Sequence, residues 1–354
     1  MKVAIVGAGI MGRLLALSLV NAGYNVNIFD QDHDSGMNSC SMAAAGLLTP
    51  MTELDKSEMI IYELGMKALA QHWPNILAEL QDNIYFQCLG SIVLNHPKDH
   101  PEMDRYIALI RTKIKNSVFQ KLNQSSLREL EPSLTKFNEA YYFPDEGQLD
   151  NQHILDALKK KLLAKQVTWH QQTFVRKIQP GMVCTESSSF QFDMVFDCRG
   201  IGAKSVFHDL QGIRGELIWL HAPEVQLKRP VRFLHPRYSV YVVPRRQNIY
   251  LLGASEITSE DQSAISVRTT LELLTAAYYL HPGFAEATIL KTVTHCRPTL
   301  ANYLPRIKYT AGWMAINGLY RHGFLIAPTL VAEIMQWLIN GNFSSNYAKL
   351  WERV

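Results

Sequence analysis

The chain opens with a pattern of apolar runs and polar boundaries that is typical of a strand, a helix and a second strand. Residues 3–6 form a short apolar run, as expected of a parallel strand that is buried on both faces. Residues 10–22 carry apolar side chains at helical spacing, and Gly23 follows as the residue that ends the helix. Residues 25–29 return to a strand pattern, with Asp30 at its carboxyl end. The opening therefore predicts one complete βαβ unit.

The rest of the chain alternates between helical and strand patterns. We expect helices at residues 54–81 with a break at Pro74, and at 102–115, 149–163, 266–280 and 328–340. We expect strands within 84–94, at 139–143, 173–178, 182–185 and 192–198, across most of 213–254, and at 314–316. Residues 31–52 have a loop-like pattern. Pro328 is placed in the first turn of the last helix, where the donor that proline lacks is not needed.

This order of elements predicts an α/β fold, α+β overall, in which a Rossmann-like βαβ domain is combined with an antiparallel sheet. The 354 residues suffice for one large domain or two interleaved ones. No Pro- or Ser-rich linker separates two halves of the sequence. We therefore expect any two domains to be interleaved along the chain.

Composition excludes several classes of protein. At 47% hydrophobic and 19% charged residues, the chain is typical of globular proteins and unlike disordered ones. Its 35 basic and 32 acidic residues give a net charge of +3, which does not suggest a nucleic-acid partner. The five cysteines are scattered and show no Cys-x-x-Cys spacing, and His96 and His100 have no evident third ligand. We expect neither a disulfide framework nor a metal site.

The apolar run that follows Lys2 could imitate a secretory signal. Arg13 interrupts this run, its glycines would weaken an apolar helix, and no small-residue cleavage site follows. No other segment reaches the roughly 18 uninterrupted apolar residues of a membrane span. We therefore expect a cytoplasmic protein without a membrane span.

The turn Gly7-Ala8-Gly9-Ile10-Met11-Gly12 lies between the first strand and the first helix. In this context Gly7 allows the tight turn, Gly9 lets the backbone approach a pyrophosphate, and Gly12 lets helix and strand pack closely. The helix N-terminus adds unpaired amides. Asp30 can accept hydrogen bonds from a ribose diol and would repel the 2′-phosphate of NADP. The motif predicts a dinucleotide site and leaves NAD and FAD open.

The carboxyl-terminal part of the chain favours FAD. Residues 316–328 form a strand, a loop bracketed by glycines and the start of a helix. A helix placed there can aim its positive end at a flavin pyrimidine and favour negative charge on the reduced ring. An NAD dehydrogenase does not need such a late return to the nucleotide. His322 belongs to this loop, where its side chain could face solvent.

Four segments resemble the D-amino-acid oxidase family of FAD-dependent oxidoreductases and, within it, the glycine oxidases associated with thiamine biosynthesis. They are the glycine-rich turn with Asp30, the small-residue run 41–50, the pair 240–245 and 253–255, and the set 296–299, 304–305 and 318–328. These segments occur in the family's order over nearly the whole chain. The resemblance implies an FAD domain with an interleaved, mainly antiparallel substrate domain. It assigns residues 1–84, 146–212 and 295–354 to the FAD-binding domain, and 85–145 and 213–294 to the substrate domain.

The resemblance also implies a set of cofactor residues. Gly7, Gly9, Ile10, Met11 and Gly12 would lie at the phosphates, Asp30 and Gln31 at the adenosine ribose, and Val175 at the adenine. Cys40, Ser41, Ala45, Gly46 and Leu47 would line the flavin side. Gly200 and the loop of Gly318, Leu319, Tyr320, Arg321, His322, Gly323, Phe324 and Leu325 would complete the site. No motif for a covalent link is present at Cys40, so we expect FAD to be bound non-covalently.

For the substrate, the resemblance implies that Arg297 pairs with a carboxylate, that the Tyr241 hydroxyl assists it, and that Arg321 is a second arginine of the site. Hydride loss from an amino-acid α-carbon needs no strong protein base, so positioning by a bidentate arginine is the main task. A structural salt bridge for Arg297 and a core role for Tyr241 stay open. Glu256 is acidic where related glycine oxidases can carry an apolar residue, and it could favour a basic or amine-rich substrate.

These expectations describe an FAD-dependent oxidase of glycine or another small amino acid. Hydride would pass to flavin N5, and O2 would reoxidise the flavin to give hydrogen peroxide. The imine product would hydrolyse or supply thiazole synthesis for thiamine. The alternatives are a quinone-linked amino-acid dehydrogenase of the same family, a tRNA-modifying relative, and a flavin-binding protein without catalysis. The expected partners are the small substrate and O2, and a homo-oligomer stays open.

Overall fold

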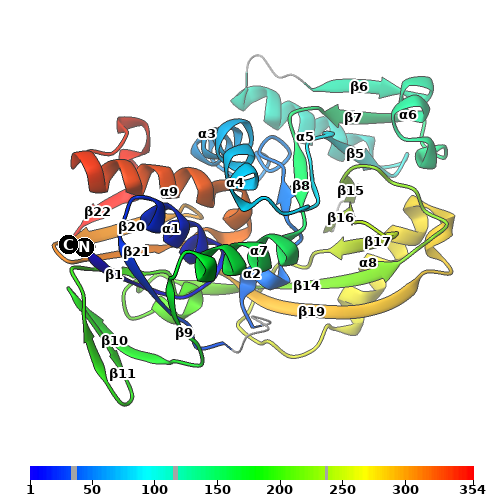
Figure 1. Cartoon of the computed structure of the whole chain (residues 1–354). Helices are drawn as coiled ribbons and strands as arrows, with labels where there is room; N and C mark the ends of the chain where they lie inside the picture. Colours follow the sequence, from blue (N-terminus) through cyan, green and yellow to red (C-terminus); the bar gives the residue numbers. More distant parts are fainter. Residues whose placement is uncertain (33–37, 115–118, 236–237) are drawn as a thin grey trace.

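The computed structural model describes residues 1–32, 38–114, 119–235 and 238–354 (Figure 1). Two large sheets dominate it. The first has seven strands in the order β22-β20-β21-β13-β1-β2-β9. Its strands are β1 (Lys2–Val6), β2 (Asn25–Phe29), β9 (Thr168–His170), β13 (Met194–Asp197), β20 (Arg306–Thr310), β21 (Trp313–Asn317) and β22 (Trp351–Arg353). The central strands pair in parallel and β20 pairs antiparallel to β21.

The predicted βαβ unit is confirmed. Strand β1 is followed by α1 (Ile10–Asn21) and by β2, which pairs in parallel with β1. Residues 3–5 are wholly buried, which explains why this strand is a continuous apolar run. Pairing of β1 with β13 and of β2 with β9 places the carboxyl ends of several parallel strands at one edge of the sheet.

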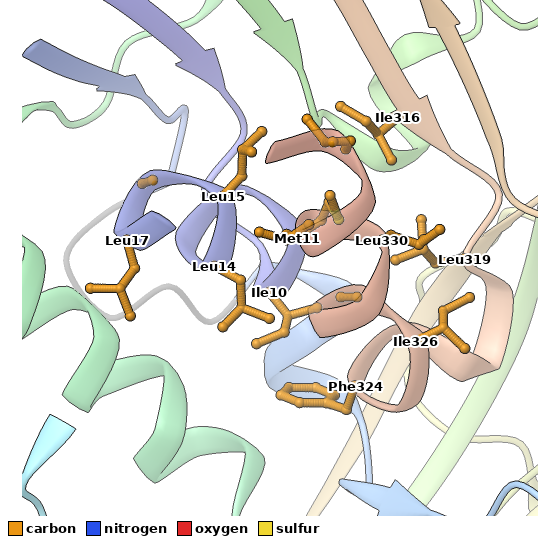
Figure 2. Close-up of a cluster of buried hydrophobic side chains, with 14 of the residues drawn as sticks. Ile10, Met11, Leu14, Leu15, Leu17, Ile316, Leu319, Phe324, Ile326 and Leu330 are labelled. Atoms are coloured by element: carbon orange, nitrogen blue, oxygen red, sulfur yellow. The ribbon is translucent and has the colours of Figure 1, made fainter. Parts of the chain in front are cut away.

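Helix α9 (Gly323–Asn340) packs beside α1 and carries the core of this half of the molecule (Figure 2). Labelled side chains of α1 (Ile10, Met11, Leu14) and of the β21–α9 segment (Ile316, Leu319, Phe324, Ile326, Leu330) lie together in one buried cluster. Other helices of this half are α3 (Met59–Lys67), α4 (Trp73–Leu80) and α7 (Asn151–Ala164). Among the described helices, α1 and α9 have the largest helix–helix contact. One begins at the glycine-rich turn and the other at the late loop.

Two expectations about proline are corrected. Helix α9 begins at Gly323, so Pro328 lies inside the helix and not in its first turn. The carbonyl of Phe324, four residues before Pro328, instead accepts a hydrogen bond from the indole Nε1 of Trp73 at 3.0 Å. Pro74 does not separate two helices, because α3, a π-helical segment (Ala68–His72) and α4 run on continuously, with Pro74 in the first turn of α4.

The second large sheet has nine strands in the order β18-β14-β17-β16-β15-β5-β7-β6, with β19 paired to β14. Its strands are β5 (Ser91–Asn95), β6 (Gln120–Asn123), β7 (Glu139–Phe143), β14 (Gln211–His221), β15 (Val231–His235), β16 (Tyr238–Pro244), β17 (Ile249–Gly253), β18 (Ile257–Thr258) and β19 (Thr288–Thr299). All its pairings are antiparallel except that of β5 with β15. Helices α5 (His100–Lys113), α6 (Gln124–Leu130) and α8 (Val267–Leu280) pack on it.

Short elements complete the fold. They are α2 (Cys40–Ala43), the sheet of β3 (Leu47–Leu48), β8 (Gly147–Leu149) and β4 (Phe86–Gln87), the sheet of β10 (Val175–Gln179), β11 (Met182–Thr185) and β12 (Ser189–Gln191), and the 3-10 segments Pro132–Leu134, Gly200–Ala203, Pro282–Phe284, Tyr320–His322 and Ser345–Leu350. The loop expected at residues 31–52 therefore contains a helical turn and a strand. Residues 33–37 of that stretch lie outside the described residues. The predicted domain boundaries stay a prediction.

Within the described residues, the stretch Tyr320–Asn340 is long and apolar enough to cross a membrane by length and composition alone. Within its most apolar 18-residue window, 61% is buried in the protein, and α9 packs against α1 and α3. Its apolar character is accounted for by its position in the core.

Candidate functional site

One cavity of about 1240 Å³ joins the carboxyl ends of β1 and β2 to the second large sheet. This is larger than the roughly 300–1,000 Å³ of most small-molecule sites, so a dinucleotide and a small ligand can share it. The predicted residues on its wall are Gly7, Gly9, Ile10, Met11, Asp30, Gln31, Cys40, Ser41, Ala45, Gly46, Leu47, Val175, Gly200, Tyr241, Arg297, Leu319, Tyr320, Arg321, His322, Gly323, Phe324 and Leu325. Gly12 and Gly318 are not among the residues that line the cavity.

The glycines of the first turn have different surroundings. Gly7 has a φ of +100°, and a Cβ there would lie 2.6 Å from the carbonyl oxygen of Cys198. A Cβ on Gly12 would overlap the carbonyl oxygen of Gly7. Among the described residues, a Cβ on Gly9 would meet only the Ser41 hydroxyl, at 3.2 Å. Gly7 and Gly12 thus permit the turn itself, whereas Gly9 leaves room for a ligand to approach the backbone.

Buried polar groups hold this end of the cavity in place. The Arg13 guanidinium donates from Nε to the Ala8 carbonyl and from Nη1 to the Leu155 carbonyl, both at 2.6 Å. The Ser41 hydroxyl accepts from the amide of Ile10 at 3.0 Å. Burial raises the pKa of Asp30, whose carboxylate accepts from the amide of Asp32 at 3.3 Å. The turn and the acidic residue at the end of β2 are therefore fixed around a cleft that suits a ribose and a diphosphate.

The late loop brings the N-terminus of α9 to the same cavity, since Tyr320, His322 and Gly323 all line it. The expectation that His322 could face solvent is wrong, because the residue is only 4% exposed. Burial disfavours the imidazolium and lowers the pKa of His322 to about 3, although the Glu53 carboxylate lies 4.0 Å away. His322 is therefore neutral near pH 7, and the positive end of α9 is not reinforced by an imidazolium charge.

The depressed pKa of His322 makes a testable contribution to the pH dependence of stability. At pH values between the ordinary histidine pKa of about 6.5 and the folded-state pKa, only the unfolded chain takes up this proton. The free energy of unfolding therefore decreases by up to about 1.4 kcal/mol for each pH unit as the pH falls. Burial raises the pKa of Glu146 to about 7, which acts in the opposite direction and partly masks the loss. Between about pH 7 and pH 5, the free energy of unfolding should fall less in the His322→Asn variant than in the wild type. The difference between the two decreases should be about 2 kcal/mol. Urea unfolding of both proteins at the two pH values measures this difference, and parallel changes would contradict it.

Arg297 lies on β19 and lines the cavity. Its Nη1 donates to the Ser255 carbonyl at 3.1 Å, and among the described residues it has no carboxylate partner. A Cβ on Gly215 of β14 would overlap the guanidinium, so glycine at this position gives Arg297 its place over the sheet. Within the part of the chain that the structure describes, Arg297 does not form the structural salt bridge that the sequence left open. An arginine held by a carbonyl at a cavity wall can bind an anion with the rest of its fork.

Tyr241 lies on β16 and lines the cavity on the same side as Arg297. A Cβ on Gly253 would lie 2.6 Å from the Tyr241 hydroxyl, so the ring lies directly over this glycine of β17. Burial raises the pKa of Tyr241, although the nearby Arg297 charge acts against the rise. The phenol therefore keeps its proton near neutral pH and can donate a hydrogen bond.

Arg321 belongs to an ion-pair cluster that sequence reasoning missed. Its Nε lies 2.6 Å from Oε2 of Glu53, a buried carboxylate that also pairs with Arg232. Nη1 of Arg232 lies 3.5 Å from Oδ1 of Asp55. Burial alone would raise the pKa of Glu53, but the charges of Arg321 and Arg232 outweigh it and lower the pKa to about 2. Arg321 thus lines the cavity, and its charge is already paired with the Glu53 carboxylate.

Glu256 extends this cluster. Its carboxylate pairs with Lys56 Nζ at 2.9 Å, accepts a hydrogen bond from the Tyr320 hydroxyl, and lies 3.7 Å from Nη1 of Arg321. Burial acts to raise the pKa of Glu256, but the Tyr320 hydrogen bond and the Arg321 charge lower it to about 2. Because its charge is matched by Lys56 and Arg321, Glu256 does not offer the free carboxylate that would favour a basic substrate.

Other notable side chains have partners of their own. Arg199 pairs with the buried Asp197 at 2.7 Å, and Lys204 pairs with Glu260 at 2.5 Å. Cys40 is a half-buried free thiol on the cavity wall. Among the residues that the structure describes, no group of three or more His, Cys, Asp or Glu side chains could hold a metal ion.

Comparison with known proteins places these features in a family. Residues 2–336 match the family described as FAD dependent oxidoreductase (DAO). The chain is 33% identical over 340 residues to ThiO of Rhizobium etli, a protein named for thiamine biosynthesis, covering 96% of this chain and 97% of that protein. It is 24% identical to the glycine oxidase of Geobacillus kaustophilus, covering 94% of this chain and 92% of that protein.

Solved structures show the same fold. The crystal structure of glycine oxidase from Geobacillus kaustophilus superposes with a TM-score of 0.86 at 22% identity, covering 99% of this chain and 98% of that one. Iminodiacetate oxidase from Chelativorans sp. BNC1 superposes with a TM-score of 0.84 at 21% identity, covering 99% of both chains. At these identities the likeness concerns the fold.

Proposed function

The chain belongs to the DAO family of FAD-dependent oxidoreductases, and from this premise we propose that it oxidises glycine or another small α-amino acid. The observation that carries the proposal is Arg297. Its guanidinium has no carboxylate partner among the described residues, and it faces the same cavity as the glycine-rich turn. Tyr241, with a donor hydroxyl, lines that cavity too. These are the groups that an amino-acid carboxylate requires.

The cavity suits FAD by the geometry of its own residues. Gly9 leaves the backbone of the turn open to a diphosphate, the Asp30 carboxylate can accept from a ribose, and the N-terminus of α9 supplies a positive dipole end. We infer a non-covalent site, with the predicted residues at the phosphates, ribose, adenine and flavin ring. FAD, when bound, accepts the hydride that leaves the α-carbon of the substrate.

The protein's own part is orientation. Arg297 holds the substrate carboxylate through the side of its fork that Ser255 leaves free, and Tyr241 donates a second hydrogen bond from its neutral hydroxyl. The substrate must react with a neutral amine, whose lone pair helps the hydride to leave. We assign no catalytic acid or base, because that chemistry needs positioning more than proton abstraction from carbon.

The overall reaction converts glycine, O2 and water into glyoxylate, ammonia and hydrogen peroxide. The first organic product is the imine, which water hydrolyses. The likeness to ThiO, a protein named for thiamine biosynthesis, supports a role in which the imine is used for thiazole synthesis before it hydrolyses.

Steady-state assays test the proposal. We expect the purified holoenzyme to consume oxygen with glycine, sarcosine or D-alanine, and to release equal amounts of hydrogen peroxide and oxo acid. Turnover that requires a quinone acceptor and gives no peroxide would instead identify an amino-acid dehydrogenase. Absence of turnover with every amino acid and either acceptor would contradict both.

A further inference from the structure

Glu256 occupies an unusual position in the cavity. Glu256 directly follows Ser255, whose carbonyl accepts a hydrogen bond from Arg297. The Glu256 carboxylate and the Arg297 guanidinium therefore belong to the same end of the site. The Tyr320 hydroxyl donates to one carboxylate oxygen of Glu256, and Lys56 Nζ lies 2.9 Å from the other. Tyr320 is itself buried, and its ring packs against Tyr303 at 5.5 Å. Glu256 is therefore held in one orientation.

The charges around Glu256 balance. Three carboxylates (Glu53, Asp55, Glu256) pair with three cations (Arg232, Arg321, Lys56) through contacts of 4 Å or less. Arg297 adds one further positive charge, for which no carboxylate partner is present among the described residues. This end of the cavity can therefore neutralise one carboxylate of a ligand.

Removing the charge of Glu256 would change this balance. Lys56 would lose its carboxylate partner, and Arg321 would keep only Glu53. The Lys56 ammonium is about half exposed and lines the cavity, so it would be free to meet a second ligand carboxylate. Two cations, Arg297 and Lys56, would then face the ligand.

We propose that Glu256 is a specificity-determining residue, which restricts the site to monocarboxylates by neutralising the cations that would hold a second carboxylate. The proposal rests on the proposed function in so far as Arg297 receives the first carboxylate. It extends that function by naming the excluded substrate class, the amino and imino dicarboxylates.

Binding of two unreactive probes tests the proposal. Acetate carries one carboxylate and malonate carries two, and isothermal titration calorimetry of the holoenzyme gives the ratio of their dissociation constants without any turnover. In Glu256→Gln this ratio should shift towards malonate by about tenfold relative to the wild type, since a cation a few ångströms from an anion in a partly solvated site is worth a change of that order. Lys56→Gln should shift the ratio in the opposite direction. Glu139→Gln, which removes the carboxylate of an ion pair with Lys121 where β6 and β7 meet, outside the lining of the cavity, is the matched control.

An unchanged ratio in Glu256→Gln, or a shift towards malonate in Lys56→Gln, would overturn the proposal. If Glu256→Gln fails to retain FAD, the Lys56→Gln variant alone tests the proposal. An unchanged ratio of dissociation constants in Lys56→Gln would then also overturn it. The failure of the proposed function looks different. In that case glycine and its analogues would not be oxidised, whereas the acetate-to-malonate ratios would still respond to the two substitutions as stated.

Discussion

Replacing Arg297 with lysine should raise the KM for the amino-acid substrate about 100-fold while FAD stays bound. Lysine keeps the positive charge but loses the planar fork that can contact a carboxylate through two parallel hydrogen bonds. A hydrogen bond to a charged group contributes about 1.5–3 kcal/mol, which corresponds to one to two orders of magnitude in affinity. The Ser255 carbonyl, which accepts a hydrogen bond from Arg297 Nη1, and the substrate carboxylate would then share a single ammonium as their donor.

The readouts are the KM for glycine, the rate of the reductive half-reaction, and the visible flavin spectrum of the purified variant. Arg105→Lys, on the exposed face of α5 and paired with Glu102, is the matched control and should resemble the wild type in all three. Loss of FAD from Arg297→Lys would assign Arg297 to the structure of the protein. An unaltered KM would exclude it as the carboxylate partner.

Alanine at Gly12 and at Gly9 should separate two roles within one turn. At Gly12 the new methyl group would overlap the carbonyl of Gly7, so α1 must move away from β1, and we expect a loss of about 3 kcal/mol or more in unfolding free energy. At Gly9 the methyl group would enter the cavity, and the Ser41 hydroxyl is the one group near it among the described residues. Gly9→Ala should therefore fold normally and bind FAD at least tenfold more weakly, because its methyl group would occupy the space left for the diphosphate.

Thermal unfolding of the two apoproteins and FAD titration of each measure these effects. We expect a large drop in Tm for Gly12→Ala and almost none for Gly9→Ala. Equal losses of stability in both variants would mean that Gly9 also serves the turn. Normal FAD affinity in Gly9→Ala would place the diphosphate elsewhere.

The βαβ unit could be predicted because its signals are local. A buried parallel strand is an uninterrupted apolar run, a helix has its own period, and the glycine-rich turn lies between them in a fixed order. The same locality explains the success at β13, a short apolar run that pairs with β1, and at β21, which pairs with β13.

The sequence of strand β19 has no such local pattern. Its first five residues are exposed, so this long strand has neither an apolar run nor a regular alternation. Its conformation comes from its antiparallel pairing with the whole length of β14, which no local pattern announces. Arg297 was therefore singled out by family resemblance and not as a strand residue, and its place over Gly215 could only be found in the folded chain.

The ion-pair cluster of Glu53, Arg232 and Arg321 was beyond sequence reasoning for a related reason. Its members are far apart in the chain and come from a turn after β3, from β15 and from the loop before α9. A charged residue is normally solvated, and nothing in the sequence indicates that these three are partly buried together. His322 was misjudged for the same reason, because its burial depends on the neighbouring elements and not on the loop that carries it.

Anaerobic mixing of the purified holoenzyme with glycine is the most direct test of the proposed oxidation, since it observes the flavin and its reaction with the substrate in one spectrum. We expect a yellow protein whose flavin absorption disappears on addition of glycine, sarcosine or D-alanine and returns when air is admitted. A protein without flavin absorption, or a bound flavin that no amino acid reduces, would contradict it.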